Sequence, residues 1–209
     1  MPTAYSLPPL VMKAPAKPRG RRRCLAAKEA ILSATMKLLE KKPLREVTAD
    51  AIAQLAGVSK ATIYKWWPNK SLVALEAFLS RVQSHVVTPD TGSAQKDFTL
   101  QLKALVRFFN SPSGRLYSQF IAEGQFDPAF LMQYRERFLQ ARRDEVRVMW
   151  KRGVERGEIR SKIDGDIALD LIYGAAIFRL LTGHSPLNDK EAEAMVDAAF
   201  QGLQAQPLS

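Results

Sequence analysis

Apolar residues recur every three or four positions along most of the chain, which is the period of an α-helix with one buried face. The first such segment carries Ala27, Ile31, Ala34 and Leu38 on one face. It ends before Pro43, because proline disfavours helical backbone in the residue before it. The same period predicts helices at about 98–110, 115–123, 127–156, 166–182 and 189–204. Because no segment alternates with a period of two, the pattern predicts an all-α fold.

Two proline-containing stretches predict how the chain is divided. Residues 1–20 contain several prolines and basic residues, and we expect them to form a disordered basic arm, since proline resists helix formation. Pro89, Asp90 and Gly92 mark a turn or linker. The predicted division is an arm at 1–20, an N-terminal domain at 21–80 and a helical C-terminal domain at 81–209.

The segment between residues 48 and 72 has the pattern of two short helices joined by a tight turn. Thr48 and Ser59 are good N-caps, because a hydroxyl oxygen accepts a hydrogen bond from an otherwise free amide. Gly57 lies where the first helix must end, since glycine adopts the left-handed conformation at little cost. The apolar residues expected to bury this unit are Ile52, Leu55, Ala56 and Val58. This pattern is a helix-turn-helix.

The second helix of this unit, expected to run to about Trp66, would enter the major groove of DNA with its N-terminal residues at the base edges. Thr62 can offer a hydroxyl or a methyl group to a base. Tyr64 and Lys65 can donate to phosphates, which position a protein without reading sequence. The residues expected to face the groove or its walls are Lys60, Ala61, Thr62, Tyr64 and Lys65.

Lys70 lies in the first turn of the helix that is predicted to follow Pro68 and Asn69. A helix N-terminus with a lysine is a favourable phosphate site, because free amides and the helix dipole attract anions. The alternative is that Lys70 is only a solvated charge. The adjoining helix-turn-helix favours the phosphate contact.

This stretch closely resembles the DNA-binding domain of the tetracycline-repressor-like (TetR) family of bacterial transcriptional regulators, over residues 27–78. The matching residues are Thr48, Ile52, Ala53, Ala56, Gly57, Val58, Ser59, Thr62, Tyr64, Lys70 and Leu72. Trp67 stands where the family more often has Phe, and we expect it to fill the same core position. Ala61 stands where Gly is common. Beyond residue 78 the chain resembles the family only in its succession of predicted helices.

The resemblance implies an all-helical homodimer in which an N-terminal three-helix domain binds DNA and a helical domain behind it binds a ligand and dimerises. It also implies that Thr48, Tyr64 and Lys70 touch phosphate, and a dimer implies a palindromic operator. The basic residues at 21–23 either follow the DNA backbone, enter the minor groove, or only add counterion release. The candidate DNA-binding residues are Arg22, Arg23, Thr48, Ser59, Lys60, Ala61, Thr62, Tyr64, Lys65 and Lys70.

Basic charge is concentrated in the N-terminal part, which supports an anionic partner. Residues 1–80 contain 14 Lys and Arg against 5 Asp and Glu, whereas residues 81–209 contain 17 against 16. The alternative explanation is that the basic residues only keep the N-terminal part soluble. It does not explain why residues 81–209 carry almost no net charge. The single cysteine, Cys24, cannot form an intrachain disulfide, and no apolar run is long enough to span a membrane. We therefore expect a cytoplasmic protein.

Aromatic residues are dense in the middle helices of the C-terminal domain, where we expect a small-molecule pocket. They are Phe108, Phe109, Tyr117, Phe120, Phe126, Phe130, Tyr134 and Phe138, and the candidate polar anchors are Glu123, Arg142 and Glu145. The pocket is assigned to Phe108, Tyr117, Phe120, Glu123, Phe126, Tyr134, Phe138 and Arg142. The alternative is that these aromatics only form the core, as aromatics at helical spacing usually do.

The segment 166–182 is apolar on two faces, so it is either central in its domain or packed at an interface. The two stripes are Ile167, Leu171, Phe178 and Leu181, and Leu169, Ile172, Ala176 and Leu180. Proteins similar to this one dimerise through their last two long helices. The dimer interface is accordingly assigned to Ile172, Ala176, Arg179, Leu180, Met195, Val196 and Phe200. A monomer that buries these helices in its own core is the alternative.

Two rival functions are disfavoured. An enzyme is one, because His85 and His184 have no Cys or carboxylate at metal-ligand spacing, and neither a phosphate loop nor a nucleophile elbow is present. We expect no catalytic site, metal or cofactor. A general DNA-compacting or RNA-binding protein is the other rival function. Such a protein requires only the basic charge, and it does not explain the Gly57 turn or the N-caps on either side of it. The sequence predicts a sequence-specific transcriptional regulator. Since repression is the usual mode of the family it resembles, we expect a repressor that is released from its operator by a small and largely apolar ligand.

Overall fold

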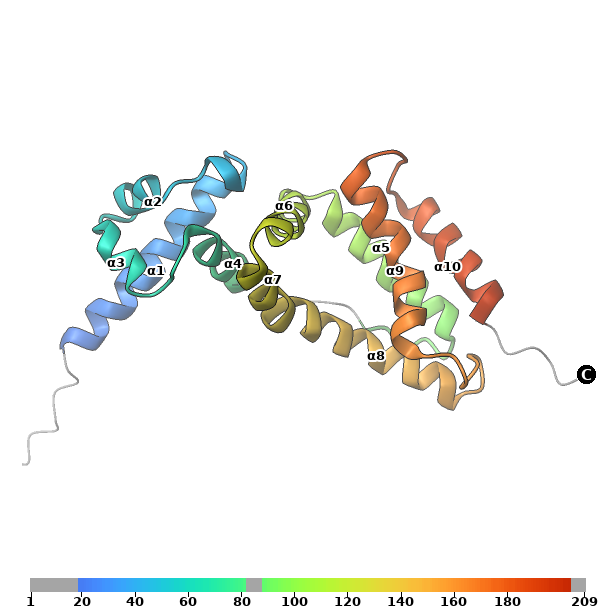
Figure 1. The fold of residues 1–209 in the computed structure, drawn as a ribbon. Helices are drawn as coiled ribbons and strands as arrows, with labels where there is room; N and C mark the ends of the chain where they lie inside the picture. The colour runs from blue at the N-terminus through green and yellow to red at the C-terminus, as the bar shows by residue number, and fades with distance from the viewer. Residues whose placement is uncertain (1–18, 82–87, 204–209) are drawn as a thin grey trace, which may run out of the picture.

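The structure, a computed structural model, describes residues 19–81 and 88–203, and every regular element in these two ranges is helical. The predicted all-α fold class is therefore confirmed. The elements are α1 (Arg19–Leu39), η1 (Leu44–Glu46), α2 (Ala49–Ala56), α3 (Lys60–Tyr64), α4 (Lys70–Arg81), α5 (Ala94–Phe109), α6 (Pro112–Phe126), α7 (Pro128–Tyr134), η2 (Arg135–Leu139), α8 (Gln140–Glu155), α9 (Gly165–Thr182) and α10 (Asp189–Leu203). Helices α1–α4 lie at one end of an elongated molecule, and α6 and α7 lie between them and the remaining helices (Figure 1).

The first four helices surround a small core of their own. Its fully or almost fully buried side chains are Ile31, Val47, Ile52, Ile63, Trp67 and Val73. Trp67 is 3% exposed, so it occupies the core position that the sequence assigned to it. Helix α1 begins at Arg19, two residues before the predicted start of the N-terminal domain at residue 21, because the run from Arg19 to Arg23 is rich in good helix formers. The rest of the predicted arm, residues 1–18, lies outside the described residues.

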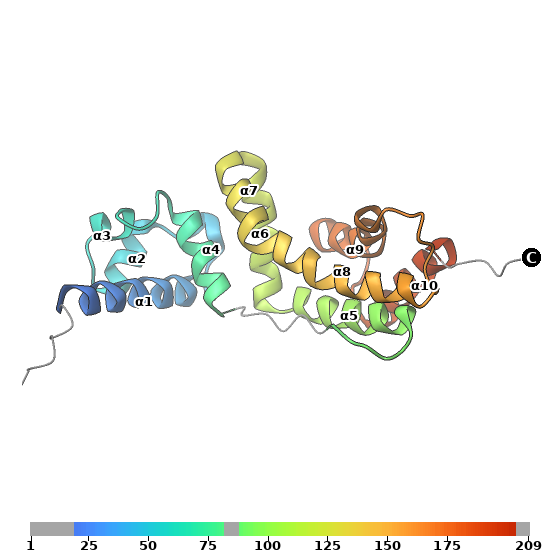
Figure 2. The same cartoon turned by 90° about the horizontal axis from the view of Figure 1, so that it is seen from below.

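The other six α-helices enclose a larger core. Helix α5 is central in it, since it contacts α6, α8, α9 and α10, and α10 packs along it most extensively (Figure 2). The largest fully buried side chains here include Phe98, Leu102, Phe120, Phe130 and Met149. This arrangement leaves α9 in contact with α5, α8 and α10 on one side only.

Helices α7 and α8 form one continuous helical run in which residues Arg135–Leu139 make a π-helical turn. The run begins at the predicted place, because Asp127 Oδ1 accepts hydrogen bonds from the amides of Ala129 and Phe130, each 3.0 Å long. The sequence predicted an uninterrupted α-helix as far as Arg156 and missed the π turn. Such a turn follows from one extra residue in the helical ladder and is frequent at functional sites.

Aromatic rings pack α4 against the helices of the C-terminal part. The ring of Phe78 is fully buried and lies 5.3 Å from the ring of Phe120 on α6 and 5.5 Å from that of Phe138 in the π turn, both in edge-to-face geometry. Ring pairs of this kind add stabilisation beyond the burial of their area. The last helix of the N-terminal unit is therefore packed firmly onto the C-terminal helices.

Polar contacts reinforce the same junction. Ser71 Oγ donates to Glu123 Oε1 over 2.6 Å, and Arg137 on the π turn lies 3.3 Å from Glu76 Oε2 on α4. Each contact joins α4 to a different element of the C-terminal part. Ser71 and Glu76 thus link α4 to α6 and to the π turn.

Candidate nucleic-acid interface and ligand cavity

The helix-turn-helix has the capping geometry that its sequence predicts. Thr48 Oγ1 accepts a 3.1 Å hydrogen bond from the amide of Ala51, and Ser59 Oγ accepts a 3.2 Å bond from the amide of Thr62. Between the two helices Gly57 has φ +67°, in the left-handed region that favours glycine. These three local devices set the angle between α2 and α3.

Helix α3 has one buried and one exposed face. Ile63 is fully buried and holds the helix against the small core. The exposed face is formed by Lys60, Ala61, Tyr64 and Lys65, positions that share one side of a helix. Tyr64 is 47% exposed although it is a large aromatic residue. Such a face, with two cations, a phenol and a small residue, suits close approach to a phosphate-lined groove.

Two of the predicted base-reading side chains have partners within the protein. Lys60 Nζ lies 2.9 Å from Asp50 Oδ2 in the first turn of α2, and the hydrogen bond and charge of Asp50 raise the pKa of Lys60 above its ordinary value. Thr62 Oγ1 lies 2.9 Å from Ser59 Oγ. The hydroxyl of Thr62 is thus shared with the cap, which leaves its methyl group as the freer contact.

The ammonium group of Lys70 is directed into the protein. Its Nζ donates to the main-chain carbonyl oxygens of Leu44, Arg45 and Val47 over 3.1, 3.0 and 2.8 Å. An ammonium group has three N–H donors, so these three bonds account for all of them. Lys70 therefore closes the end of η1 against the start of α4, a role that sequence reasoning did not anticipate.

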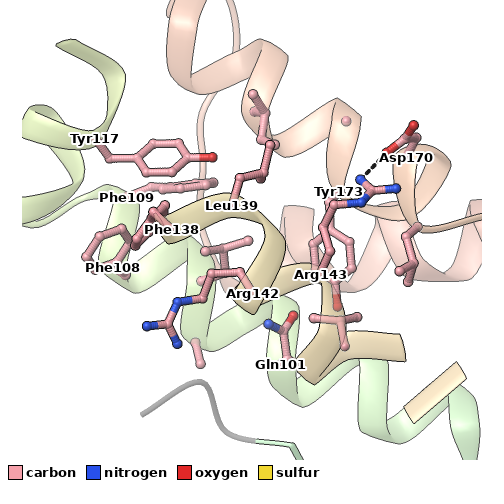
Figure 3. Close-up of a pocket in the computed structure, with 16 residues that line it drawn as sticks. Gln101, Phe108, Phe109, Tyr117, Phe138, Leu139, Arg142, Arg143, Asp170 and Tyr173 are labelled. Atoms are coloured by element: carbon pink, nitrogen blue, oxygen red, sulfur yellow. Dashed lines mark hydrogen bonds and ion pairs between the residues drawn. The ribbon is translucent and has the colours of Figure 1, made fainter. Parts of the chain in front are cut away.

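A cavity of about 330 Å³ lies among the C-terminal helices. Its wall comes from α5, α6, the π turn, α8 and α9 (Figure 3). The lining residues are Gln101, Ala104, Leu105, Phe108, Phe109, Tyr117, Phe138, Leu139, Arg142, Arg143, Val146, Leu169, Asp170, Tyr173, Gly174 and Ile177. The volume lies at the lower end of the range of about 300–1,000 Å³ for small-molecule sites.

An apolar face of α9 is left uncovered. Ile167, Leu171 and Phe178 are 60–61% exposed and Leu181 is 47% exposed, and their spacing puts them on one side of the helix. Ala175 is exposed on the same side. A contiguous apolar stripe of this length on a surface marks an interaction site.

Two family models together match most of the chain. The model described as "Bacterial regulatory proteins, tetR family" matches residues 31–77, and the model described as "Tetracyclin repressor-like, C-terminal domain" matches residues 88–199, which is more than half of the chain. The chain belongs to the TetR family of bacterial regulatory proteins.

Similar proteins support this assignment over nearly the full length. The HTH-type transcriptional regulator YdeS of Bacillus subtilis (strain 168) is 41% identical over 187 residues, which cover 90% of this chain and 94% of that protein. The crystal structure of the TetR family transcription regulator SCO0332 superposes with a TM-score of 0.70 at 30% identity, covering 87% of this chain and 99% of that chain. NalD, the secondary repressor of the MexAB-OprM multidrug efflux pump in Pseudomonas aeruginosa, shares the fold, with a TM-score of 0.61 at 20% identity over 87% of this chain and 98% of that chain.

The TetR-family chain is thus a helix-turn-helix transcriptional regulator, of a family whose members bind operator DNA as dimers and respond to small molecules. In the described residues no group of three or more His, Cys, Asp or Glu side chains is placed to hold a metal ion. None of the helices in those residues is long and apolar enough to cross a membrane.

Half of the predicted pocket residues line the cavity of this TetR-family protein, namely Phe108, Tyr117, Phe138 and Arg142. The other four do not. Phe120 and Tyr134 are buried in the core beside the cavity, where burial also raises the pKa of Tyr134. Glu123 binds Ser71 at the junction, and Phe126 is 88% exposed at the end of α6. The helical period identifies a buried face but does not distinguish a core from a cavity.

The cavity residues that the sequence missed come mainly from α5 and α9. Gln101, Leu105 and Phe109 follow one another at four-residue spacing on α5, and Leu169, Tyr173 and Ile177 do so on α9. This spacing was visible in the sequence. The same spacing is typical of an ordinary buried core, so it does not by itself indicate a cavity.

Most of the predicted dimer residues are buried within the TetR-family protomer itself. Ile172, Ala176, Val196 and Phe200 are 0–2% exposed, so they cannot form a contact surface. Arg179 is partly exposed and forms an ion pair with Glu191, and Leu180 and Met195 are partly buried against the core. The apolar side chains open to a partner are those of the other stripe, from Ile167 to Leu181.

The basic residues Arg22 and Arg23 belong to the first turns of α1 and not to an extended arm. Their side chains lie outside what the structure describes. Their contribution to DNA binding therefore stays a prediction.

Proposed function

We propose that the protein is a homodimeric repressor that binds a palindromic operator through α3 and leaves it when a small, largely apolar molecule fills the cavity. The observation that carries this proposal is the exposed polar face of α3, held by Ile63 and the caps of Thr48 and Ser59. A repressor role is supported by shared fold with NalD, which is described as a repressor of an efflux pump.

In the proposed complex α3 lies in the major groove with Ala61 allowing close approach. Lys60 and Thr62 face the base edges, Lys65 faces the phosphates of the groove wall, and Thr48 and Tyr64 contact further phosphates. The Thr48 hydroxyl accepts the amide of Ala51 and still has its own hydrogen to donate. Lys70 acts indirectly, because its bonds to three carbonyls hold the start of α4 in place.

The proposed dimer forms through the uncovered stripe of α9. Two copies of this stripe, with Leu171 and Phe178 at its centre, would pack around a two-fold axis, as homodimers usually do. A two-fold dimer presents two α3 helices to two half-sites, so the operator is expected to be palindromic.

Ligand release is proposed to act through the π turn. Phe138 and Leu139 of this turn line the cavity, while Arg137 of the same turn contacts Glu76 on α4. A molecule that enters the cavity must displace the turn or hold it in one position. Because α4 follows the helix-turn-helix directly, either effect changes the spacing of the two α3 helices in the dimer.

The direct test is fluorescence anisotropy of the full chain with duplex DNA from upstream of its own gene, against a shuffled duplex at the same salt concentration. A specific regulator binds the former at least about a thousandfold more tightly. Equal affinity for both duplexes, and for unrelated fragments tiled across the region, would support a general DNA-binding protein and overturn the proposal.

A further inference from the structure

Two of the residues that line the cavity each carry a buried polar atom that has no hydrogen-bond partner. These atoms are Oε1 of Gln101 on α5 and the hydroxyl oxygen of Tyr173 on α9. Gln101 is 5% exposed, so water outside the protein does not satisfy it. An unpaired buried polar atom is unfavourable, so each one in a native protein calls for an explanation, such as a bound molecule that completes its hydrogen bonds.

The two atoms offer different chemistry. Oε1 of Gln101 can only accept a hydrogen bond, whereas the hydroxyl of Tyr173 can also donate one. Burial raises the pKa of Tyr173 well above its ordinary value, so this hydroxyl keeps its proton at neutral pH. A ligand group that donates and accepts at once satisfies both side chains.

The charged groups of the cavity wall already have partners of opposite charge. Arg142 lies 2.9 Å from Glu145 and sits over the ring of Phe138, and Arg143 lies 2.5 Å from Asp170 and 3.1 Å from Asp166. An anionic ligand would have to compete with these carboxylates, and a cationic ligand would meet two arginines. The wall therefore favours a ligand without net charge.

The aromatic and the polar residues of the cavity wall lie in different parts of it. Figure 3 shows the rings of Phe108, Phe109 and Tyr117 gathered at one end of the view, and Gln101 and Tyr173 toward the other. The rings of Phe109 and Tyr117 lie 5.3 Å apart, and Phe138 is 5.8 Å from Tyr117. An aromatic body is expected to pack against such a cluster of rings.

We infer that the ligand is an uncharged aromatic molecule of small size with one hydroxyl or amide group, which donates to Gln101 Oε1 and accepts from the Tyr173 hydroxyl. The inference rests on the proposal that the cavity is the effector site. Its specific content is the ligand class and the two side chains that select it.

The test compares three probes of nearly equal size: 2-naphthol, naphthalene and 2-naphthoate. Each is titrated into the full chain, with binding followed by calorimetry or by the fluorescence of the probe. We expect 2-naphthol to bind at least about tenfold more tightly than either of the others, which corresponds to one good hydrogen bond. Tighter binding of 2-naphthoate, or equal binding of 2-naphthol and naphthalene, would overturn the inference.

Variants assign the selectivity to the two side chains. Tyr173→Phe and Gln101→Leu are each expected to weaken 2-naphthol binding about tenfold and to leave naphthalene binding unchanged. A loss of affinity for both probes would indicate altered packing and not a lost hydrogen bond, and it would count against the inference.

Gly174 provides the control for location. Gly174 lines the cavity, and a Cβ atom added there has no heavy atom within 4 Å, so an alanine fits at this position without displacing a neighbour. Gly174→Leu should abolish binding of 2-naphthol, whereas Gly174→Ala, which removes the same glycine, should retain it. Unchanged binding in Gly174→Leu would place the probe elsewhere and overturn the inference.

The outcomes separate this inference from the proposed function. Operator binding by the unliganded chain is measured in parallel for every variant. If none of the three probes binds while specific operator binding persists, the ligand class is wrong and the DNA-binding function stands. If operator binding is absent in the wild type, the proposed function fails whatever the probes do.

Discussion

The indole Nε1 of Trp67 donates a 2.9 Å hydrogen bond to Oε2 of Glu76. The same carboxylate lies 2.6 Å from Lys28 on α1 and 3.3 Å from Arg137 on the π turn. Trp67 belongs to the core behind α3, and Arg137 belongs to the turn that lines the cavity. Glu76 therefore connects the two proposed sites through direct polar contacts.

Replacing Arg137 should weaken the coupling between the ligand cavity and DNA binding more than it weakens binding at the cavity or at the DNA interface. In Arg137→Gln we expect operator affinity within about threefold of the wild type, because the pair is partly exposed and contributes little to stability. We expect release by a cavity ligand to require more ligand, measured by anisotropy of the operator complex. Arg135→Gln is the control, since Arg135 lies on the same turn and is exposed. Equal loss of response in both variants would contradict a specific role of Arg137.

The Glu76 carboxylate should give the N-terminal unit a pH-dependent stability. Partial burial raises the pKa of Glu76, but hydrogen bonds from Lys28, Trp67 and Arg137 outweigh burial and leave the pKa below its ordinary value of 4.5. A carboxyl whose pKa is lowered by folding stabilises the folded state above that ordinary value, and this contribution is lost as the pH falls through the folded-state pKa. Urea unfolding between pH 6 and pH 3 should show a shallower loss of stability in Glu76→Gln than in the wild type. Parallel curves for the two proteins would contradict this.

The parts of the structure that sequence predicted correctly are those that local chemistry decides. The caps at Thr48 and Ser59 and the turn at Gly57 depend on residues within three positions of one another, so their spacing is readable without a fold. The cavity was half predicted, because Phe138 and Phe126 have the same residue type and only packing makes one of them line a cavity and the other face solvent. The π turn left no signal, since its residues are ordinary helix formers.

The pair between Asp50 and Lys60 should limit the affinity of α3 for DNA. Asp50 places a negative charge beside the proposed DNA-facing side and engages the ammonium of Lys60. Asp50→Asn frees Lys60 and removes a charge that repels phosphate, so binding to operator and to random duplex should both tighten several-fold, with a steeper salt dependence. Glu46→Gln makes the same change of charge nearby without a partner on α3 and should have a smaller effect. Equal effects of the two substitutions would mean that only net charge matters.

Substitutions of Lys70 and Lys65 should distinguish a lysine that stabilises the fold from one that contacts DNA. Lys70→Met removes three charge-assisted hydrogen bonds to carbonyls and should lower the free energy of unfolding by about 2 kcal/mol. Lys65→Met, on the exposed face of α3, should leave stability unchanged and reduce the salt slope of DNA binding by about one. If Lys70→Met keeps full stability in urea and reduces the salt slope, then Lys70 contacts phosphate directly, as the family resemblance implied.

The uncovered stripe of α9 predicts which residues control assembly. Leu171 is 60% exposed at the centre of the stripe, and Leu100 on α5 is 49% exposed away from it. A glutamate at position 171 would place a charge in the proposed two-fold contact, where it has no partner and burial is costly. Leu171→Glu should therefore be monomeric by sedimentation and should bind a palindromic operator far more weakly than the wild type, because one α3 helix then acts alone. Leu100→Glu makes the same chemical change on the surface and should remain a dimer with full affinity. A dimeric Leu171→Glu would move the interface away from this face of α9 and leave the apolar stripe without a role.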